Sequence, residues 1–248
     1  MEPVQAYQLV YNLMSLSIAA MGSSFFFFVS ARSALKPENR MAVTLSATVV
    51  LIALYHYVRI FNSWVDTAGG TLGTFNEAYR YVDWILTVPL LVAELVLVLR
   101  LDSKLESMLI KRNVVYAFLM IATGYIGEMD EQTTVVLTSA RTIWGFISSV
   151  FFVLILRDLF GGIAVSIKKQ SKEIQGIFRI LRVVLLATWG VYPIAYLLPT
   201  ITTSIGLSVA DGMVLKQVGY TIADILAKPG YGLLIWTVSY THLRAHET

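Results

Sequence analysis

The amino-acid sequence predicts an all-α membrane protein, a bundle of seven transmembrane helices. Of its 248 residues, 56% are hydrophobic and 14% are charged, whereas about a quarter of the residues of a soluble domain are charged. The chain also holds seven apolar segments of about 20 residues or more, the length that crosses a bilayer. These segments are residues 7–31, 41–64, 77–100, 107–127, 133–158, 174–199 and 213–240.

Each segment is predicted to be a helix because it is a long continuous apolar run, whereas the strands of a membrane β-barrel are short and alternate. No polar stretch is long enough for a separate soluble domain, so residues 1–240 are expected to form one transmembrane domain. Connections are short, so neighbouring helices are antiparallel. Residues 65–76 are rich in glycine and threonine and are expected to form a small hairpin. The tail, residues 241–248, resembles a translated adapter sequence and is expected to be non-native.

The placement of basic residues predicts the orientation in the membrane. The first, third and fifth connections and their flanks carry Lys and Arg, and the sixth offers only Lys216. The second and fourth carry neither, and hold the acidic residues Asp66, Glu128, Asp130 and Glu131. Because cytoplasmic connections are enriched in Lys and Arg, we expect the N-terminus outside and the C-terminus in the cytoplasm.

The composition excludes several kinds of chemistry. The chain has no cysteine, which excludes disulfides, thiol catalysis and Cys-ligated metals. Only three histidines are present, and two of them lie in the last seven residues. A histidine-based metal cluster is therefore not expected.

The third segment carries the densest set of polar groups: Arg80, Asp83, Thr87 and Glu94. At 100° per residue, Asp83 and Glu94 share a helix face and lie about 16 Å apart along the axis. The order from the outside is Arg80, Asp83, Thr87 and Glu94, so titratable groups line a path across the membrane. Stability alone gives no reason for three charges on one spanning helix.

The last segment places Asp224 and Lys228 four residues apart, on one face of a helix at bilayer depth. Two interpretations follow from this pair alone. It could be a structural ion pair, because a charge in the membrane needs a partner. It could instead hold a ligand, because a buried amine beside a carboxylate suits a lasting Schiff base.

Two further segments offer candidate residues. In the second, His56 stands beside Tyr57, and it is either a satisfied core histidine or the partner of a carboxylate. In the sixth, Pro193 is expected to kink the helix. Trp189, Tyr192 and Tyr196 repeat there at helical spacing, as Tyr81 and Trp84 do in the third. Such aromatic stripes are usually packing, but two of them around an amine could enclose a flat apolar ligand.

Three motifs together resemble those of the microbial (type 1) rhodopsins: RYVDWILTVP at 80–89, WGVYP at 189–193 and DILAKPG at 224–230. The resemblance extends to about residue 240. It implies that Lys228 binds all-trans retinal as a protonated Schiff base, with Asp83 and Asp224 as counterions. It also makes Asp83 the proton acceptor, with Arg80 responding to its charge. The residues that match the retinal pocket are Trp84, Trp189, Tyr192 and Pro193, and we add Tyr57.

Asp83, Thr87 and Glu94 resemble the Asp–Thr–Glu motif of the proteorhodopsin and xanthorhodopsin branches, and the flanking sequence is closer to the xanthorhodopsin side. Glu94 then matches the cytoplasmic proton donor, and His56 the histidine that partners the acceptor. Leu91 stands where leucine is associated with green rather than blue absorption. Gly145, after Trp144, resembles the glycine that opens a window for a hydroxylated carotenoid, although a glycine there could also simply let two helices pack.

The resemblance implies a light-driven outward proton pump rather than an enzyme. A photosensor or a pump of sodium or chloride on the same fold are the alternatives, and Glu94 with Asp83 argues against them. It further implies a multi-pass protein of the bacterial inner membrane, in contact with lipid, with no nucleic-acid partner, and forming a homo-oligomer, with a pentamer favoured. One departure is Pro229, which directly follows the lysine, removes the backbone bond to Ile225 and is expected to distort the helix.

Overall fold

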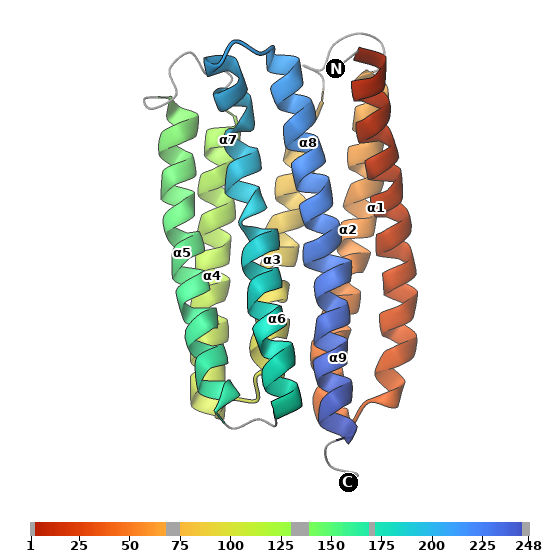
Figure 1. The fold of residues 1–248 in the computed structure, drawn as a ribbon, viewed down its shortest axis with the longest axis vertical. Helices are drawn as coiled ribbons and strands as arrows, with labels where there is room; N and C mark the ends of the chain where they lie inside the picture. The colour runs from red at the N-terminus through yellow and green to blue at the C-terminus, as the bar shows by residue number, and fades with distance from the viewer. Residues whose placement is uncertain (1–2, 68–74, 130–138, 169–171, 245–248) are drawn as a thin grey trace.

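The computed structural model describes residues 3–67, 75–129, 139–168 and 172–244. Within these ranges the chain forms helices joined by short connections, and the helices stand side by side as one bundle (Figure 1). The helices and helical turns are α1 (Pro3–Ala31), η1 (Arg32–Ala34), η2 (Pro37–Asn39), α2 (Arg40–Asp66), α3 (Ala78–Val98), α4 (Ser103–Glu128), α5 (Ala140–Ile167), α6 (Lys172–Trp189), α7 (Val191–Ser204), α8 (Val209–Ile225), η5 (Leu226–Gly230) and α9 (Tyr231–Arg244).

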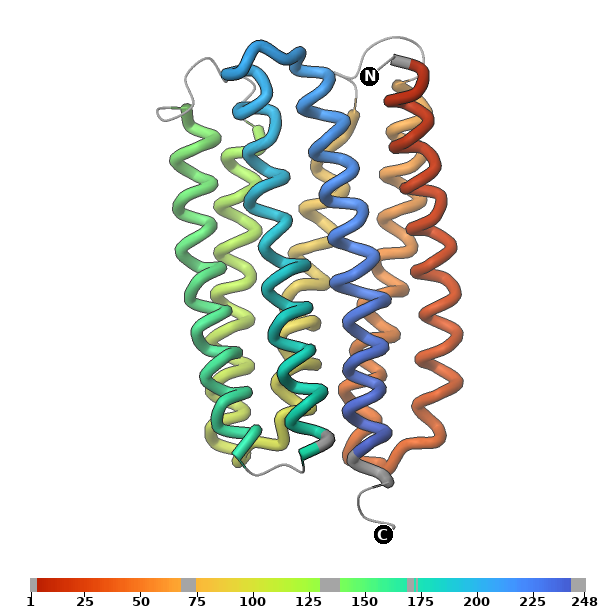
Figure 2. The backbone as a smooth tube through the Cα atoms, viewed as in Figure 1, coloured from red at the N-terminus to blue at the C-terminus, as the bar shows by residue number. Residues whose placement is uncertain are grey.

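These elements make seven columns, which confirms the predicted fold class. Figure 2 shows that α7 continues the column of α6, and that α9 continues the column of α8 through η5. By length and composition, six of the columns are apolar enough to cross a membrane. The seventh, α8–η5–α9, is divided into shorter pieces and carries Asp224 and Lys228.

The break between α6 and α7 falls at Gly190, one turn before Pro193. Proline has no N–H, so Pro193 cannot donate to the carbonyl of Trp189, four residues earlier. The helix therefore ends at Trp189 and restarts at Val191. The predicted kink is confirmed, and it lies where the missing bond leaves the chain free to turn.

Pro229 has the predicted effect on the last column. Residues 226–230 form a π-helical turn, in which the N–H of Tyr231 bonds to the carbonyl of Leu226, five residues back. Such turns often accompany functional sites. This one contains Lys228 and therefore sets the direction in which its side chain leaves the helix.

The polar face of α3 lies inside the bundle. This helix packs between α2 and α4 and also contacts α5 and α9. Its four polar residues, Arg80, Asp83, Thr87 and Glu94, are all fully buried, which confirms that they share one inward face. The lipid-facing surface is apolar instead, as with the exposed Phe26 and Phe146.

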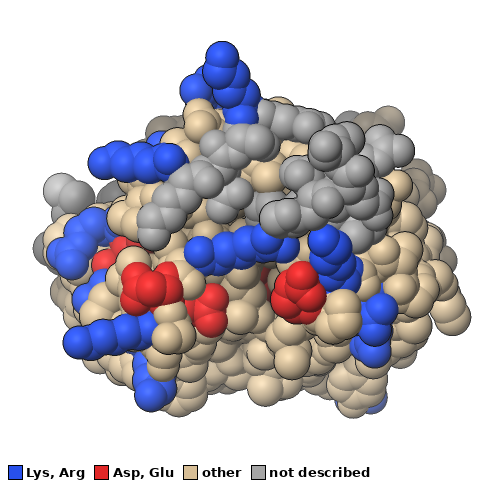
Figure 3. Space-filling view, turned by 90° about the horizontal axis from the view of Figure 1, so that it is seen from below, with Lys and Arg blue, Asp and Glu red and all other residues tan. Residues whose placement is uncertain are grey.

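The two termini lie at opposite ends of the bundle, as expected for seven columns (Figure 1). Seen from the end where the chain finishes, the surface carries many Lys and Arg side chains (Figure 3). This agrees with the basic character of the first, third and fifth connections. That this end faces the cytoplasm stays a prediction.

Some predicted boundaries were wrong. α5 ends at Ile167, nine residues beyond the predicted end at 158. The prediction stopped at the first charges, but Asp158 is buried and paired with Arg112 of α4, so the helix continues past it. Residues 133–138 of the predicted segment, and most of the hairpin expected at 65–76, lie outside the described residues.

Candidate functional site

Lys228 lies between two carboxylates at the centre of the bundle. Its Nζ donates to Oδ2 of Asp83 on α3 and to Oδ1 of Asp224 on α8, at 2.6 Å each. All three side chains are buried, with at most 2% of each residue exposed. The pair predicted from spacing, Asp224 and Lys228, is thus joined by the predicted third residue, Asp83.

The two carboxylates have different surroundings. Asp224 accepts further hydrogen bonds from Tyr57 and Tyr192, at 2.7 Å each, and from Nε1 of Trp84 at 3.2 Å, and Arg80 lies 3.5 Å away. The Oδ1 atom of Asp83 has no hydrogen-bond partner within the described residues. Donors around Asp224 stabilise its negative charge, whereas Asp83 has a vacant acceptor atom beside the amine.

Neither Thr87 nor His56 forms a hydrogen bond with the carboxylate of Asp83 within the described residues. The hydroxyl of Thr87 donates to the backbone carbonyl of Asp83 at 2.9 Å. His56 is buried on α2, and its Nδ1 has no partner within the described residues. The two predicted partners, His56 and Asp83, thus each keep one buried atom unpaired.

Glu94 stands alone on the other side of Lys228. It is fully buried, and its Oε2 accepts one hydrogen bond, from Ser46 of α2 at 2.8 Å. Its Oε1 has no partner within the described residues. A carboxyl in a dry site with a single neutral donor favours its protonated form. Ser46 was not predicted, because a lone serine in an apolar helix carries no distinctive signal.

An elongated apolar cavity of about 260 Å³ begins at Lys228 and lies between α3, α4, α5 and α7. Besides Lys228, eight residues singled out in the sequence line it: Tyr81, Trp84, Leu91, Gly145, Trp189, Tyr192, Pro193 and Tyr196. Tyr57 is not among the lining residues, and bonds to Asp224 instead. Its aromatic and aliphatic walls, with an amine at one end, fit a long apolar molecule held through a carbonyl carbon.

Gly145 lines the far end of this cavity, next to the exposed Phe146. A Cβ at Gly145 would lie 2.6 Å from the ring of Tyr196. The glycine is therefore needed for the close approach of that ring. Both predicted interpretations of Gly145, packing and access to the cavity, agree with this geometry.

A network of charged and polar side chains extends from Asp224 towards the end of the bundle where the N-terminus lies. Arg80 donates to Gln217 at 2.9 Å and to Thr221 at 3.0 Å, and Gln217 donates to Glu77 at 2.8 Å. Lys216 then bridges Glu77 and Glu128, at 2.7 and 2.6 Å.

This network of side chains ends at Arg141, which lies 2.9 Å from Glu128 and donates to the carbonyl of Tyr196. The prediction that Lys216 belongs to the sixth connection is wrong: Lys216 is buried two turns inside α8, because this helix begins at Val209. One signal was missed: Gln217 and Thr221 precede Asp224 and Lys228 at steps of four, three and four residues, which is one helix face.

Known proteins are similar to this chain in fold and in sequence. Residues 8–242 match the family model of bacteriorhodopsin-like proteins. The crystal structure titled xanthorhodopsin, a light-driven ion pump with dual chromophore, is 43% identical with a TM-score of 0.87, over 98% of this chain and 96% of that one. A thermophilic rhodopsin is 41% identical with a TM-score of 0.86, over 96% and 95%. The green-light absorbing proteorhodopsin of Gamma-proteobacterium EBAC31A08 is 26% identical over 90% of this chain and 83% of that protein.

The fold, the buried lysine between two carboxylates and the matches along nearly the whole chain agree with one another. The chain belongs to the bacteriorhodopsin-like family, the microbial type 1 rhodopsins.

Proposed function

We propose that this protein is a light-driven outward proton pump that binds all-trans retinal through Lys228. The observation that carries the proposal is the arrangement along α3, where Lys228 meets Asp83 on one side and Glu94 lies about three turns away on the other. The similarity to xanthorhodopsin, a light-driven ion pump, and to the green-light absorbing proteorhodopsin supports the same class of activity.

Retinal bound in the cavity would supply light absorption and, by isomerising, a change in the direction of the N–H bond at Lys228. The protein's own residues do the rest. Asp83 receives the proton, because its Oδ1 is unpaired while Asp224 is held ionised by its four donor groups, Tyr57, Tyr192, Trp84 and Arg80. Asp224 thus serves as the fixed counterion.

Arg80 carries the change in charge outward. It lies next to Asp224 and bonds to Gln217, so a new charge distribution at Asp83 is transmitted to Glu77 and Lys216.

His56 is the second group that we assign to Asp83, through its unpaired Nδ1. His56→Asn should shift the pH at which the colour changes, and an unchanged titration would return His56 to a structural role.

Glu94 returns the proton from the opposite side. Its site favours the protonated form, and Ser46 holds the carboxyl in place. With the acceptor towards the N-terminal end and the donor towards the basic end, transport runs outward if the basic end is cytoplasmic (Figure 3). We place the protein in the bacterial inner membrane as a homo-oligomer, with a pentamer favoured, and expect green absorption from Leu91, which lines the cavity.

Illumination of unbuffered cells tests the proposal. Cells that make the protein and are given retinal should acidify the medium in the light, and a protonophore should abolish the signal. Lys228→Ala should be colourless and inactive, because Lys216, the other buried lysine of this column, lies about 18 Å further along it. Light-driven alkalinisation of the medium would show that the protein transports protons inward instead. A coloured protein that gives no pH change, or one that needs sodium or chloride, would favour a sensor or another ion pump.

We also propose a hydroxylated carotenoid as a second chromophore, lying on the lipid side of Gly145. The xanthorhodopsin structure is titled as having a dual chromophore, and Gly145 with Phe146 forms the rim of the cavity here. Adding such a carotenoid should give structured absorption bands and induced circular dichroism. Gly145→Trp should remove both signals. Because a larger side chain also displaces Tyr196, retained retinal colour in that variant is the necessary control.

A further inference from the structure

The lipid-facing surface of α5 and α6 changes from apolar to basic towards the C-terminal end of the bundle. On α5, the exposed Val150 and Val153 form a stripe that ends one turn later at Arg157, whose side chain is 70% exposed. On α6, the exposed Val183 is followed, one turn towards the same end, by the exposed Arg179. The apolar surface that contacts lipid chains thus ends in arginines on both helices.

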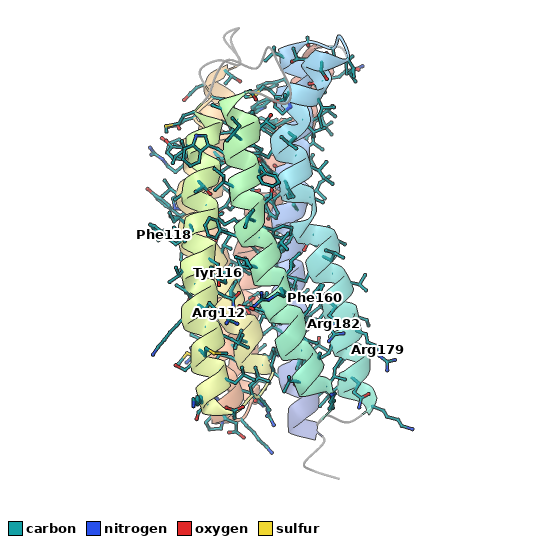
Figure 4. The ribbon with its side chains drawn as sticks, turned by 90° about the vertical axis from the view of Figure 1, so that its left-hand side faces the viewer. Arg112, Tyr116, Phe118, Phe160, Arg179 and Arg182 are labelled. Atoms are coloured by element: carbon teal, nitrogen blue, oxygen red, sulfur yellow. The ribbon has the colours of Figure 1, made fainter. Side chains whose placement is uncertain are left out.

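A third arginine lies in the groove between these helices. Arg182 of α6 donates through Nη2 to the carbonyl of Phe160 of α5 at 3.3 Å. Its Nε is buried and has no hydrogen-bond partner within the described residues. Figure 4 shows Arg182 of α6 near Phe160 of α5, with Arg112 of α4 at a similar height and Arg179 further along α6 towards its first residues.

The surface beside these arginines has room for a ligand. Gly161 of α5 and Gly176 of α6 each lie one turn from one of the arginines, and a Cβ at either position would meet no atom within 4 Å. A group could therefore approach the backbone of α5 near Arg182 and the backbone of α6 about 9 Å further towards the C-terminal end.

The positive charge here is not balanced by the protein. Asp158 of α5 is buried and accepts from Arg112 at 2.6 Å and from Asn113 at 3.3 Å, with Arg157 at 3.6 Å. Arg179 and Arg182 form no ion pair with any side chain that the structure describes. These guanidinium groups lie beside an apolar surface and can form charge-assisted hydrogen bonds with an anion from outside the chain.

We propose that Arg157, Arg179 and Arg182 bind the phosphate of an anionic phospholipid in the groove between α5 and α6. The guanidinium fork matches phosphate oxygens and forms charge-assisted hydrogen bonds with them. The acyl chains of the same lipid lie on the apolar stripe that continues from the arginines, past Val153 and Val183. A lipid is the occupant rather than free phosphate, because charge and apolar surface are continuous here.

Lipid retention tests this site directly. Retinal-bound protein is reconstituted in vesicles of equal phosphatidylglycerol and phosphatidylcholine, extracted in mild detergent and weighed by native mass spectrometry. Wild type should keep phosphatidylglycerol in preference to phosphatidylcholine. Arg179→Gln with Arg182→Gln should reduce this retention by about tenfold for each arginine removed.

The matched control is Lys104→Gln with Lys111→Gln, which removes the same charge from exposed positions of α4, a helix that does not border the groove. It should retain lipid as wild type does, and unchanged colour shows that both double variants are folded. Equal retention of phosphatidylglycerol by the two double variants, or no preference in wild type, would overturn the proposal.

Thermal bleaching separates the lipid from free phosphate. The midpoint should be higher in phosphatidylglycerol than in phosphatidylcholine vesicles, and the difference should be smaller for the arginine variant than for its control. If inorganic phosphate added in detergent raises the midpoint as much as phosphatidylglycerol does, the groove binds the free anion and the lipid assignment is wrong.

Discussion

Asp83 and Asp224 touch the same nitrogen at the same distance of 2.6 Å, yet their remaining contacts assign them different tasks. The spacing of the sequence predicts that Asp224 lies beside Lys228, and the resemblance to the microbial rhodopsins adds Asp83. The spacing does not predict that Tyr57 of α2 and Tyr192 of α7 both donate a hydrogen bond to Asp224. Those bonds depend on how three distant segments pack, and they decide which carboxylate is free to change its charge.

Asp83→Asn should shift the absorption to longer wavelength and stop light-driven acidification. The amide removes the negative charge beside Lys228, so the positive charge of the retinal linkage is less localised, and it cannot accept the proton. An absorption spectrum and the unbuffered-cell assay measure the two effects. Asp66→Asn, at an exposed position, should change neither. Wild-type acidification by Asp83→Asn would refute the acceptor role.

Glu94→Gln should leave the colour nearly unchanged, because the site is about 16 Å from Asp83 along α3. It should slow the return of the proton to Lys228 and make that step strongly pH-dependent, since water must then supply the proton. Flash photolysis across a range of pH measures the rate. Glu106→Gln, outside this site, is the control. A photocycle as fast as wild type at every pH would mean that another group is the donor.

Ser46→Ala gives a finer test of the same site. It leaves Glu94 in place but removes the one hydrogen bond that Glu94 accepts within the described residues. The donor step should change by less than in Glu94→Gln and keep its dependence on this carboxyl. A photocycle identical to wild type would show that the bond does not position Glu94.

At the scale of the helix, the effect of each proline could be predicted and its exact location could not. Pro193 and Pro229 both remove a backbone donor, and each distorts its column. One distortion becomes a break at Gly190, where a Cβ would lie 2.7 Å from the carbonyl oxygen of Leu186. The other becomes the π-helical turn that carries Lys228. Which form appears depends on the surrounding helices rather than on the proline itself.

Pro229→Ala should raise the thermal bleaching midpoint by an amount that corresponds to roughly 1 kcal/mol or more, because it restores a backbone donor inside a helix. It should also move the absorption maximum, since a tighter turn redirects the side chain of Lys228. Leu226→Ala, on the same turn but exposed to lipid, controls for a small side chain alone. A lower midpoint for Pro229→Ala would show that the π-helical turn is the more stable form here.

At the scale of the whole molecule, the seven columns and the inward face of α3 were predicted, whereas the outer network of charges was not. Glu77, Glu128 and Arg141 lie at the ends of three helices and Lys216 lies two turns inside α8, whereas the sequence assigns all four to connections or helix ends. Their contacts arise only when the bundle is assembled. The placement of loop charges therefore predicts an orientation for the bundle but does not predict its buried ion pairs.

Lys216→Met should destabilise the protein by about 3 kcal/mol, because it removes a cation from the buried Glu128 and from the partly buried Glu77. Adding Glu77→Gln should recover part of the loss, since the charges then balance again. Thermal bleaching of the single and double variants measures both effects, with Lys104→Met as the control. If the double variant is no more stable than Lys216→Met alone, charge balance is not what holds this network together.

The same network has an electrical consequence. Four cationic and four acidic side chains connect Arg141 to Lys228, namely Arg80, Arg141, Lys216 and Lys228 with Glu77, Asp83, Glu128 and Asp224. In their ionised forms their charges sum to zero. A proton that leaves through the outer half of the bundle is therefore the net charge that moves across the transmembrane electric field. An interior-negative potential of 100 mV then opposes each full crossing by about 2.3 kcal/mol. The photocurrent should therefore be largest across a short-circuited membrane and fall as the cell charges.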